Sequence, residues 1–274
     1  DRLLGAPGAR ICLIGNTLAE RMQHHAWLET ALQARFPDRG MTFRNLGFSG
    51  DELTLRLRSA GFGSPDEHLR RCRADVVWAF FGFNESFAGA EGLAKFEADL
   101  REQLRQLGSQ DYSGNGSPHI VLFTPLAVEP LPDASLAGHR SLNEQIAPYA
   151  ATMVRVAADT NVVCVDLFAM TRPAADAATE RSRTFNGLHL TDAGDRNLAI
   201  DLERAWFGDS LLENAARGER IERIRDAVLD KNFHWFNRYR TVDGYSIYGG
   251  RADLRFVDGQ SNRDVMDREM DVLD

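Results

Sequence analysis

The chain has 274 residues, of which 43% are hydrophobic and 26% charged, a composition typical of a globular protein rather than a disordered, collagen-like or disulfide-rich one. Its longest apolar run, residues 76–83, is far shorter than the roughly 20 residues that a membrane span needs. There are 32 basic and 40 acidic residues, giving a formal net charge of −8. This balance argues against nucleic acid as a partner, because phosphate neutralisation needs a basic face.

The three cysteines, Cys12, Cys72 and Cys164, predict neither a disulfide framework nor a metal site, because their number is odd and their spacings are wide. No metal-ligand spacing and no nucleotide-binding motif is present in the sequence, so we expect no cofactor and no metal. The sequence does not specify a compartment. It begins at Asp1 without a signal-type apolar segment, so we expect either a cytosolic protein or a targeting segment before this residue that directs the protein to the periplasm or outside the cell.

Short apolar runs alternate along the chain with longer segments of helical periodicity. The expected strands are residues 10–15, 41–46, 74–81, 119–124 and 162–168, and the expected helices are residues 18–36, 87–107, 141–160 and 192–207. Apolar strands that are separated by helices favour a parallel sheet covered on both faces. With right-handed crossovers this predicts an α/β protein, a three-layer α/β/α (flavodoxin-like) domain with a five-stranded parallel sheet.

The character of the sequence changes after residue 208. Residues 211–236 continue with helical periodicity, residues 233–248 contain six aromatic side chains in sixteen positions, and residues 249–274 are polar and charged. We therefore expect an α/β/α domain over residues 1–208 and an extension over residues 209–274 that comprises a helix, an aromatic segment and a charged arm. Packing against the domain is the main interpretation of the aromatic segment, and docking of a sugar or a protein partner is the alternative.

In open parallel sheets, ligands bind beyond the carboxyl ends of the strands. The segments expected there contribute the Thr17 hydroxyl at the start of a helix, the flexible Gly50, the Asn84 amide and the His189 imidazole. A hydroxyl, a base and a set of hydrogen-bond donors are the groups needed for acyl transfer through an oxyanion intermediate.

These segments resemble, in order, the sequence blocks of the SGNH or GDSL-like hydrolases. The family's Gly-Asp-Ser-Leu corresponds to Gly-Asn-Thr-Leu at residues 15–18, and its Asn-x-Gly-x-Ser-Gly-Asp to residues 45–51. Its Gly-x-Asn-Asp/Glu corresponds to residues 82–85, and its Asp-x-x-His to Asn-Gly-Leu-His at residues 186–189.

The resemblance implies an ester hydrolase, with an acyl or acetyl ester on a carbohydrate as the substrate. It implies that Thr17 attacks, that His189 is the general base and that Asn186 holds the imidazole. The backbone N–H of Gly50 and the amide of Asn84 would complete the oxyanion hole. Glu85 of the third block would contact the substrate, or form part of a turn.

The sequence departs from the family pattern at the catalytic positions. Thr17 stands where the family has serine, and its β-methyl group restricts rotation about χ1. Asn186 stands where the family has aspartate, so it cannot stabilise an imidazolium by charge. The alternative function is therefore a weakly active or inactive relative that binds a glycan, an acylated ligand or a protein partner without turnover.

Simpler interpretations exist for several of these residues. Thr17 could serve only as the N-cap of its helix, and His189 could be structural. His25 is expected to be a surface or packing residue, and His68 to be solvated. A literal Gly-Asp-Ser-Leu at residues 208–211 follows a helix and not the first strand, so we interpret it as a helix terminus with a serine cap.

Overall fold

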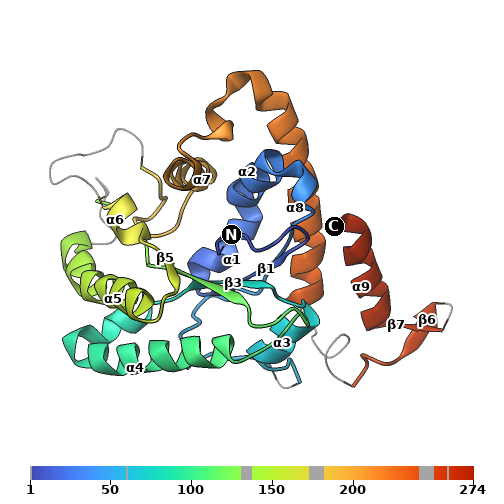
Figure 1. Ribbon diagram of the computed structural model, residues 1–274, viewed down its shortest axis with the longest axis horizontal. Coiled ribbons are helices and arrows are strands. Elements are labelled where there is room, and N and C mark those ends of the chain that lie inside the picture. The colour runs from blue at the N-terminus through green and yellow to red at the C-terminus, as the bar shows by residue number, and fades with distance from the viewer. Residues whose placement is uncertain (1, 60, 131–137, 173–181, 241–249, 258) are drawn as a thin grey trace.

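The computed structural model describes residues 2–59, 61–130, 138–172, 182–240, 250–257 and 259–274. Its centre is a five-stranded sheet in the order β2-β1-β3-β4-β5, in which every neighbouring pair is parallel (Figure 1). The strands are β1 (Arg10–Gly15), β2 (Thr42–Asn45), β3 (Val76–Phe80), β4 (His119–Phe123) and β5 (Val163–Val165). The predicted three-layer α/β/α fold is confirmed.

The central strand β3 shows why apolar runs make this sheet. All five of its residues are buried, because helices cover both faces of a parallel sheet. It pairs with β1 in the register Ile11↔Val76 and with β4 in the register Val76↔His119.

Helices cover both faces of the sheet. The helices before residue 208 are α1 (Thr17–His25), α2 (Trp27–Arg35), α3 (Pro65–Arg71), α4 (Gly89–Gly108), α5 (His139–Asp159), α6 (Leu167–Thr171) and α7 (Asp192–Phe207), with 3-10 turns at Pro37–Arg39 and Glu85–Ala88. Helices α1, α2 and α7 share one core with the sheet, and α4 and α5 share the core on the opposite face (Figure 1).

The helix expected over residues 18–36 is two helices instead of one. Ala26 lies between α1 and α2 with φ 62° in the left-handed region, and its N–H donates to the carbonyl of Met22. The two helices then pack separately, and both contact α7 and α8.

The C-terminal extension consists of 3-10 turns at Leu211–Glu213 and Ala215–Arg217, helix α8 (Gly218–Tyr239), a hairpin of β6 (Arg255–Val257) and β7 (Gln260–Ser261), and helix α9 (Asn262–Leu273). Helix α8 runs alongside the edge strand β2 (Figure 1). Its residue Ile221 belongs to the core on the α1 side of the sheet, and Trp235 to the core on the α4 side. The helix therefore closes the open edge of the sheet.

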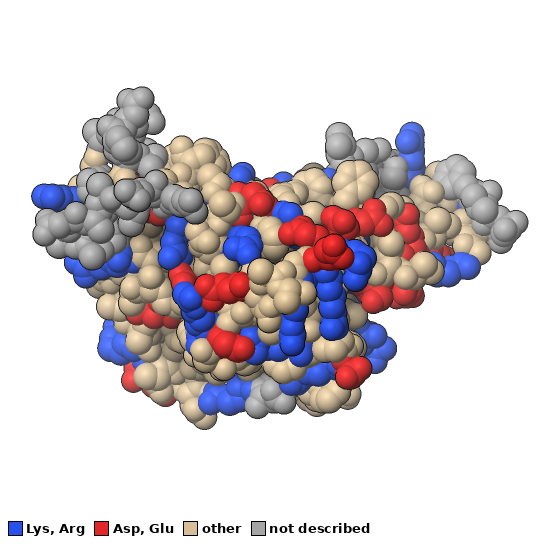
Figure 2. All heavy atoms as spheres, turned by 90° about the horizontal axis from the view of Figure 1, so that it is seen from above, with Lys and Arg blue, Asp and Glu red and all other residues tan. Residues whose placement is uncertain are grey.

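The aromatic segment over residues 233–248 contains both buried and exposed side chains. Trp235 and Tyr239 are buried, with stacked rings, whereas Phe233 is exposed, and residues 241–249 lie outside the described residues. Within residues 249–274, where a charged arm is expected, helix α9 packs on α8 and buries Met270. Acidic and basic side chains are interspersed over the face shown in Figure 2, in keeping with the mixed charge of the sequence.

Candidate active site

Thr17 is the first residue of α1, directly beyond the carboxyl end of β1. The preceding Gly15 has φ 130°, and a Cβ there would lie 2.1 Å from the carbonyl oxygen of Phe80, so the turn requires glycine. Asn16, and not Thr17, is the N-cap, because its side-chain oxygen accepts from the N–H of Leu18 at 3.1 Å. Among the described residues, no hydrogen bond occupies the Thr17 hydroxyl.

His189 lies on the loop before α7, and two side chains fix the loop's conformation. The Asn186 side-chain oxygen accepts from the backbone N–H groups of Leu188 at 3.2 Å and His189 at 2.8 Å. Glu129 accepts from the N–H groups of residues 183 and 184, and its own N–H donates to the carbonyl of Gly187 at 2.9 Å. In the described part of the chain, Asn186 therefore contacts the backbone of His189 and makes no hydrogen bond to its ring.

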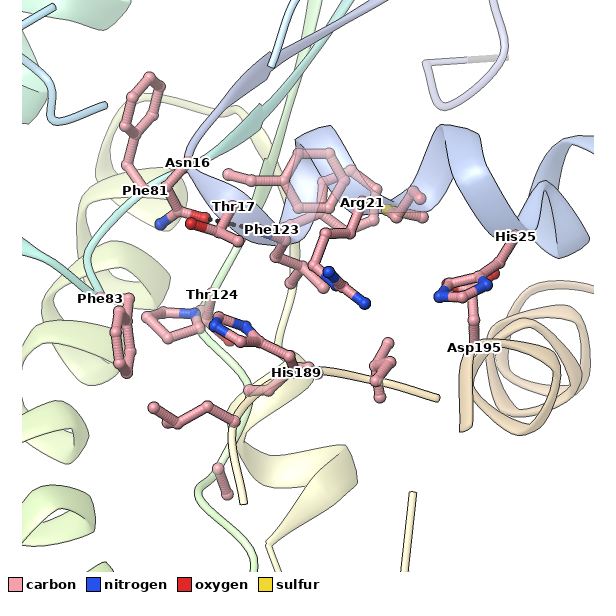
Figure 3. Close-up of a pocket in the computed structure, with 18 residues that line it drawn as sticks. Asn16, Thr17, Arg21, His25, Phe81, Phe83, Phe123, Thr124, His189 and Asp195 are labelled. Atoms are coloured by element: carbon pink, nitrogen blue, oxygen red, sulfur yellow. Dashed lines mark hydrogen bonds between the residues drawn. The ribbon is translucent and has the colours of Figure 1, made fainter. Parts of the chain in front are cut away.

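Thr17 and His189 line the same pocket (Figure 3). Its walls come from the ends of β3 and β4 and from the histidine loop, and include Phe80, Phe123 and Leu188. No hydrogen bond joins the Thr17 hydroxyl to the His189 ring among the described residues. Burial and the charge of Arg21 lower the pKa of His189, so the imidazole is neutral and able to accept a proton near pH 7.

The second and third sequence blocks form adjoining loops. The Asn84 amide donates to the carbonyl of Asp51 at 3.1 Å, so it lies beside Gly50, which has φ 84°. The Glu85 carboxylate accepts from the N–H groups of Leu53 at 2.9 Å and Gly82 at 2.8 Å, and burial raises the pKa of Glu85. Glu85 thus ties the two loops together through the backbone. Gly50, Asn84 and Glu85 do not line the pocket that Thr17 and His189 share.

The block-two loop is also joined to α1. The N–H of Phe48 donates to the carbonyl of Gly15 at 2.9 Å, and the N–H of Ser49 donates to the Glu20 carboxylate. The three segments that carry Thr17, Gly50 and Asn84 therefore meet at one edge of the sheet.

Sequence reasoning missed three ionisable residues of the pocket, namely Arg21, His25 and Asp195 (Figure 3). His25 was expected to be a surface or packing residue. Burial lowers the pKa of His25, and burial raises the pKa of Asp195 to about 7. The sequence does carry a signal for Arg21 and His25. They follow Thr17 at intervals of four residues, and residues spaced in this way lie on one face of a helix.

The literal Gly-Asp-Ser-Leu has the structural role that the sequence suggests. Gly208, with φ 87°, caps α7, and the Ser210 side chain caps the 3-10 turn that follows. The Ser210 hydroxyl donates to the buried Glu203 carboxylate at 2.7 Å. Ser210 is not among the residues that line the pocket.

The fold and these loops define an α/β/α hydrolase. The sequence matches the GDSL-like lipase/acylhydrolase family over residues 14–196. The chain therefore belongs to this family of ester hydrolases, as the resemblance of its sequence blocks implies. A comparison with curated proteins finds no match.

Two solved structures illustrate the similarity of fold. LAE5, an alpha/beta hydrolase enzyme from the metagenome of Lake Arreo in Spain, is 18% identical with a TM-score of 0.56, over 74% of this chain and 97% of LAE5. Axe2, an acetylxylan esterase from Geobacillus stearothermophilus, is 19% identical with a TM-score of 0.54, over 73% of this chain and 94% of Axe2.

Two further properties concern the described residues only. None of their helices is both long and apolar enough to cross a membrane. They contain no group of three or more His, Cys, Asp or Glu side chains arranged to hold a metal ion.

Proposed function

We propose that this protein hydrolyses an acyl or acetyl ester of a carbohydrate, with Thr17 as nucleophile and His189 as general base. The observation that carries the proposal is that the Thr17 hydroxyl and the His189 imidazole line one pocket at the carboxyl edge of the sheet. The fold shared with an acetylxylan esterase supports the choice of substrate class.

In the proposed reaction, the Thr17 oxygen attacks the ester carbonyl carbon while the imidazole of His189 takes the hydroxyl proton. The backbone N–H of Thr17 donates to the resulting oxyanion. The N–H of Gly50 and the amide of Asn84, which lie outside the pocket on adjoining loops, complete the oxyanion hole only after these loops move towards Thr17. His189 returns the proton to the departing alcohol. Water then attacks the acyl-threonine ester with His189 again as the base, which releases the acid and restores Thr17.

Asn186 has a different part in this proposal from the one that its place in the sequence block implies. Its contact with the N–H of His189 supports a role in holding the loop. Asn186 supplies no carboxylate to stabilise the imidazolium that forms during the reaction. The absence of this charge lowers the rate that the site can reach.

The test is hydrolysis of p-nitrophenyl acetate by the wild-type protein and by Thr17→Ala, His189→Ala and Thr17→Ser. Both alanine variants should lose the activity, because each lacks a group that bonds to or exchanges a proton with the substrate. Thr17→Ser should be at least as active as the wild type, because it keeps the hydroxyl and removes the β-methyl group. Asn186→Asp combined with Thr17→Ser should be faster still, because a carboxylate at this position adds a negative charge near the imidazolium even when its hydrogen bond is to the backbone of His189.

Equal rates in the wild type and in both alanine variants would rule out this mechanism. An inactive wild type that becomes active as Thr17→Ser with Asn186→Asp would instead identify a binding protein built on a hydrolase fold. His119→Ala is the matched control for His189→Ala, because His119 is exposed at the start of β4 and lies outside the pocket.

A further inference from the structure

The pocket extends from Thr17 and His189 to a second polar end formed by His25 and Asp195, with Arg21 between the two ends (Figure 3). Thr17, Arg21 and His25 lie on one face of α1, because they are spaced four residues apart. From Thr17 to His25 the helix rises about 12 Å. The lining of the pocket therefore continues along α1 for about two turns beyond Thr17.

Three side-chain atoms in this region are buried without a hydrogen-bond partner among the described residues. They are Nε of Arg21, Nε2 of His25 and Oδ2 of Asp195. Asp195 is only 2% exposed. Because an unsatisfied polar group buried in a protein costs about 1–3 kcal/mol, three such atoms on residues that line one pocket indicate that a bound group pairs with them.

The donors and acceptors of this cluster determine which chemical group of a ligand can pair with it. Asp192 approaches Nδ1 of His25 at 3.5 Å, and Nε2 of the neutral ring donates or accepts according to the tautomer. Oδ2 of Asp195 accepts when the carboxyl group is ionised and donates when it is protonated, and Nε of Arg21 is a donor. A hydroxyl group both donates and accepts without a charge, so it matches the cluster.

We infer that Arg21, His25 and Asp195 form a subsite that binds the hydroxyl groups of the sugar ring to which the ester is attached. The inference rests on the proposed function for the identity of the ester. The subsite itself is tested by binding alone. The inference assigns a role in substrate specificity to Arg21 and His25, which lie about one and two turns beyond Thr17 on α1, and to Asp195 on α7.

The test is a titration of the protein, followed by ¹H–¹⁵N NMR, with ligands that carry no ester. Methyl β-D-xylopyranoside and methyl β-D-glucopyranoside are the hydroxyl-bearing probes, and 2-methoxytetrahydropyran is the xyloside ring without its hydroxyl groups. We expect saturable shifts around α1 and α7 with at least one glycoside and none with the deoxygenated ring. Arg21→Met and His25→Phe should each raise the Kd about tenfold, as expected for the loss of one hydrogen bond.

His24→Phe is the matched control, because His24 is the exposed neighbour of His25 and contacts Phe236 instead of the pocket. Its Kd should equal that of the wild type. The inference is overturned if neither glycoside binds, if the deoxygenated ring binds equally well, or if His25→Phe behaves like His24→Phe. Glycoside binding by a protein that does not hydrolyse esters would refute the proposed function and leave the subsite intact.

Discussion

Arg21 lines the pocket and also influences the protonation of His189, the proposed general base. Its positive charge adds to the effect of burial in lowering the pKa of His189. The base works only when it is neutral, so kcat/KM for p-nitrophenyl acetate should rise with pH and level off with a midpoint below 6.5, the ordinary value for histidine. Arg21→Met should move this midpoint upward, because a nearby cation opposes protonation of the ring.

The control for this pH profile is Arg204→Met, because Arg204 pairs with Glu213 on the outer side of α7 and does not line the pocket. Its midpoint should match that of the wild type. A midpoint that stays in place or moves downward in Arg21→Met would show that Arg21 does not act on His189.

The residues of the site differ in how far the sequence could predict them. Thr17 and His189 follow from strand ends and family blocks, because backbone topology alone brings such segments to one edge. Asp195 could not be assigned, because its role depends on how α7 packs against α1. The actual partner of Asn186 was also beyond prediction, since the family block implies a contact with the ring and the structure has one with the backbone.

At the scale of elements, α8 joins the C-terminal extension to the loop that carries Gly50. Nε1 of Trp235 donates to the carbonyl of Asn45 at 2.7 Å, and the Tyr239 hydroxyl donates to the carbonyl of Leu46 at 3.2 Å. These carbonyls lie at the end of β2, where the loop begins. Arg240 pairs with Glu20, whose carboxylate also accepts from the N–H of Ser49 in this loop.

We propose that residues 209–274 fold with residues 1–208 as one cooperative unit. Trp235→Phe should lower the free energy of unfolding by about 1–3 kcal/mol, because it leaves a buried carbonyl without its donor. Urea denaturation followed by circular dichroism should show one transition at a lower midpoint. Phe233→Ala, an exposed position on the same helix, should change the free energy by less than about 0.5 kcal/mol. Two separate transitions in the wild type would contradict the proposal.

The elements were predictable where their apolar pattern is strong. The five strands of the sheet and helix α7 lie where the periodicity puts them, except that residues 167 and 168, expected in the last strand, belong to helix α6. The break at Ala26 was not predictable, because alanine favours helix and its left-handed conformation follows from packing of α1 and α2 on α7 and α8. Helix α9 was missed because few of its residues are apolar, and Met270 is buried only through contact with the rest of the chain.

At the scale of the whole molecule, His68 makes stability depend on pH. It is 4% exposed, not solvated as expected, and Nε2 lies 2.8 Å from the carbonyl oxygen of Phe62. Burial lowers the pKa of His68 to about 4 from 6.5. The unfolded chain therefore takes up this proton more readily than the folded protein, and stability is lost as the pH falls from 6.5 towards 4, by on the order of 3 kcal/mol.

His68→Gln should reduce this pH dependence. The free energy of unfolding, measured in urea at several pH values between 7 and 4, should fall less steeply in the variant than in the wild type. The exposed His119, substituted in the same way, is the control and should leave the slope unchanged. Equal slopes in all three proteins would exclude His68 as the source.

The position of α8 against the edge strand also affects the order in which the protein can be completed during synthesis. Trp235 and Asn45 are 190 residues apart in the chain, and the family blocks end before α8 begins. A chain emerging from the ribosome is therefore expected to display the unpaired edge of β2 until α8 has been made, which is after all the segments of the family blocks. Such an edge can pair with another chain. We expect the nascent protein to need protection from aggregation until α8 has been translated.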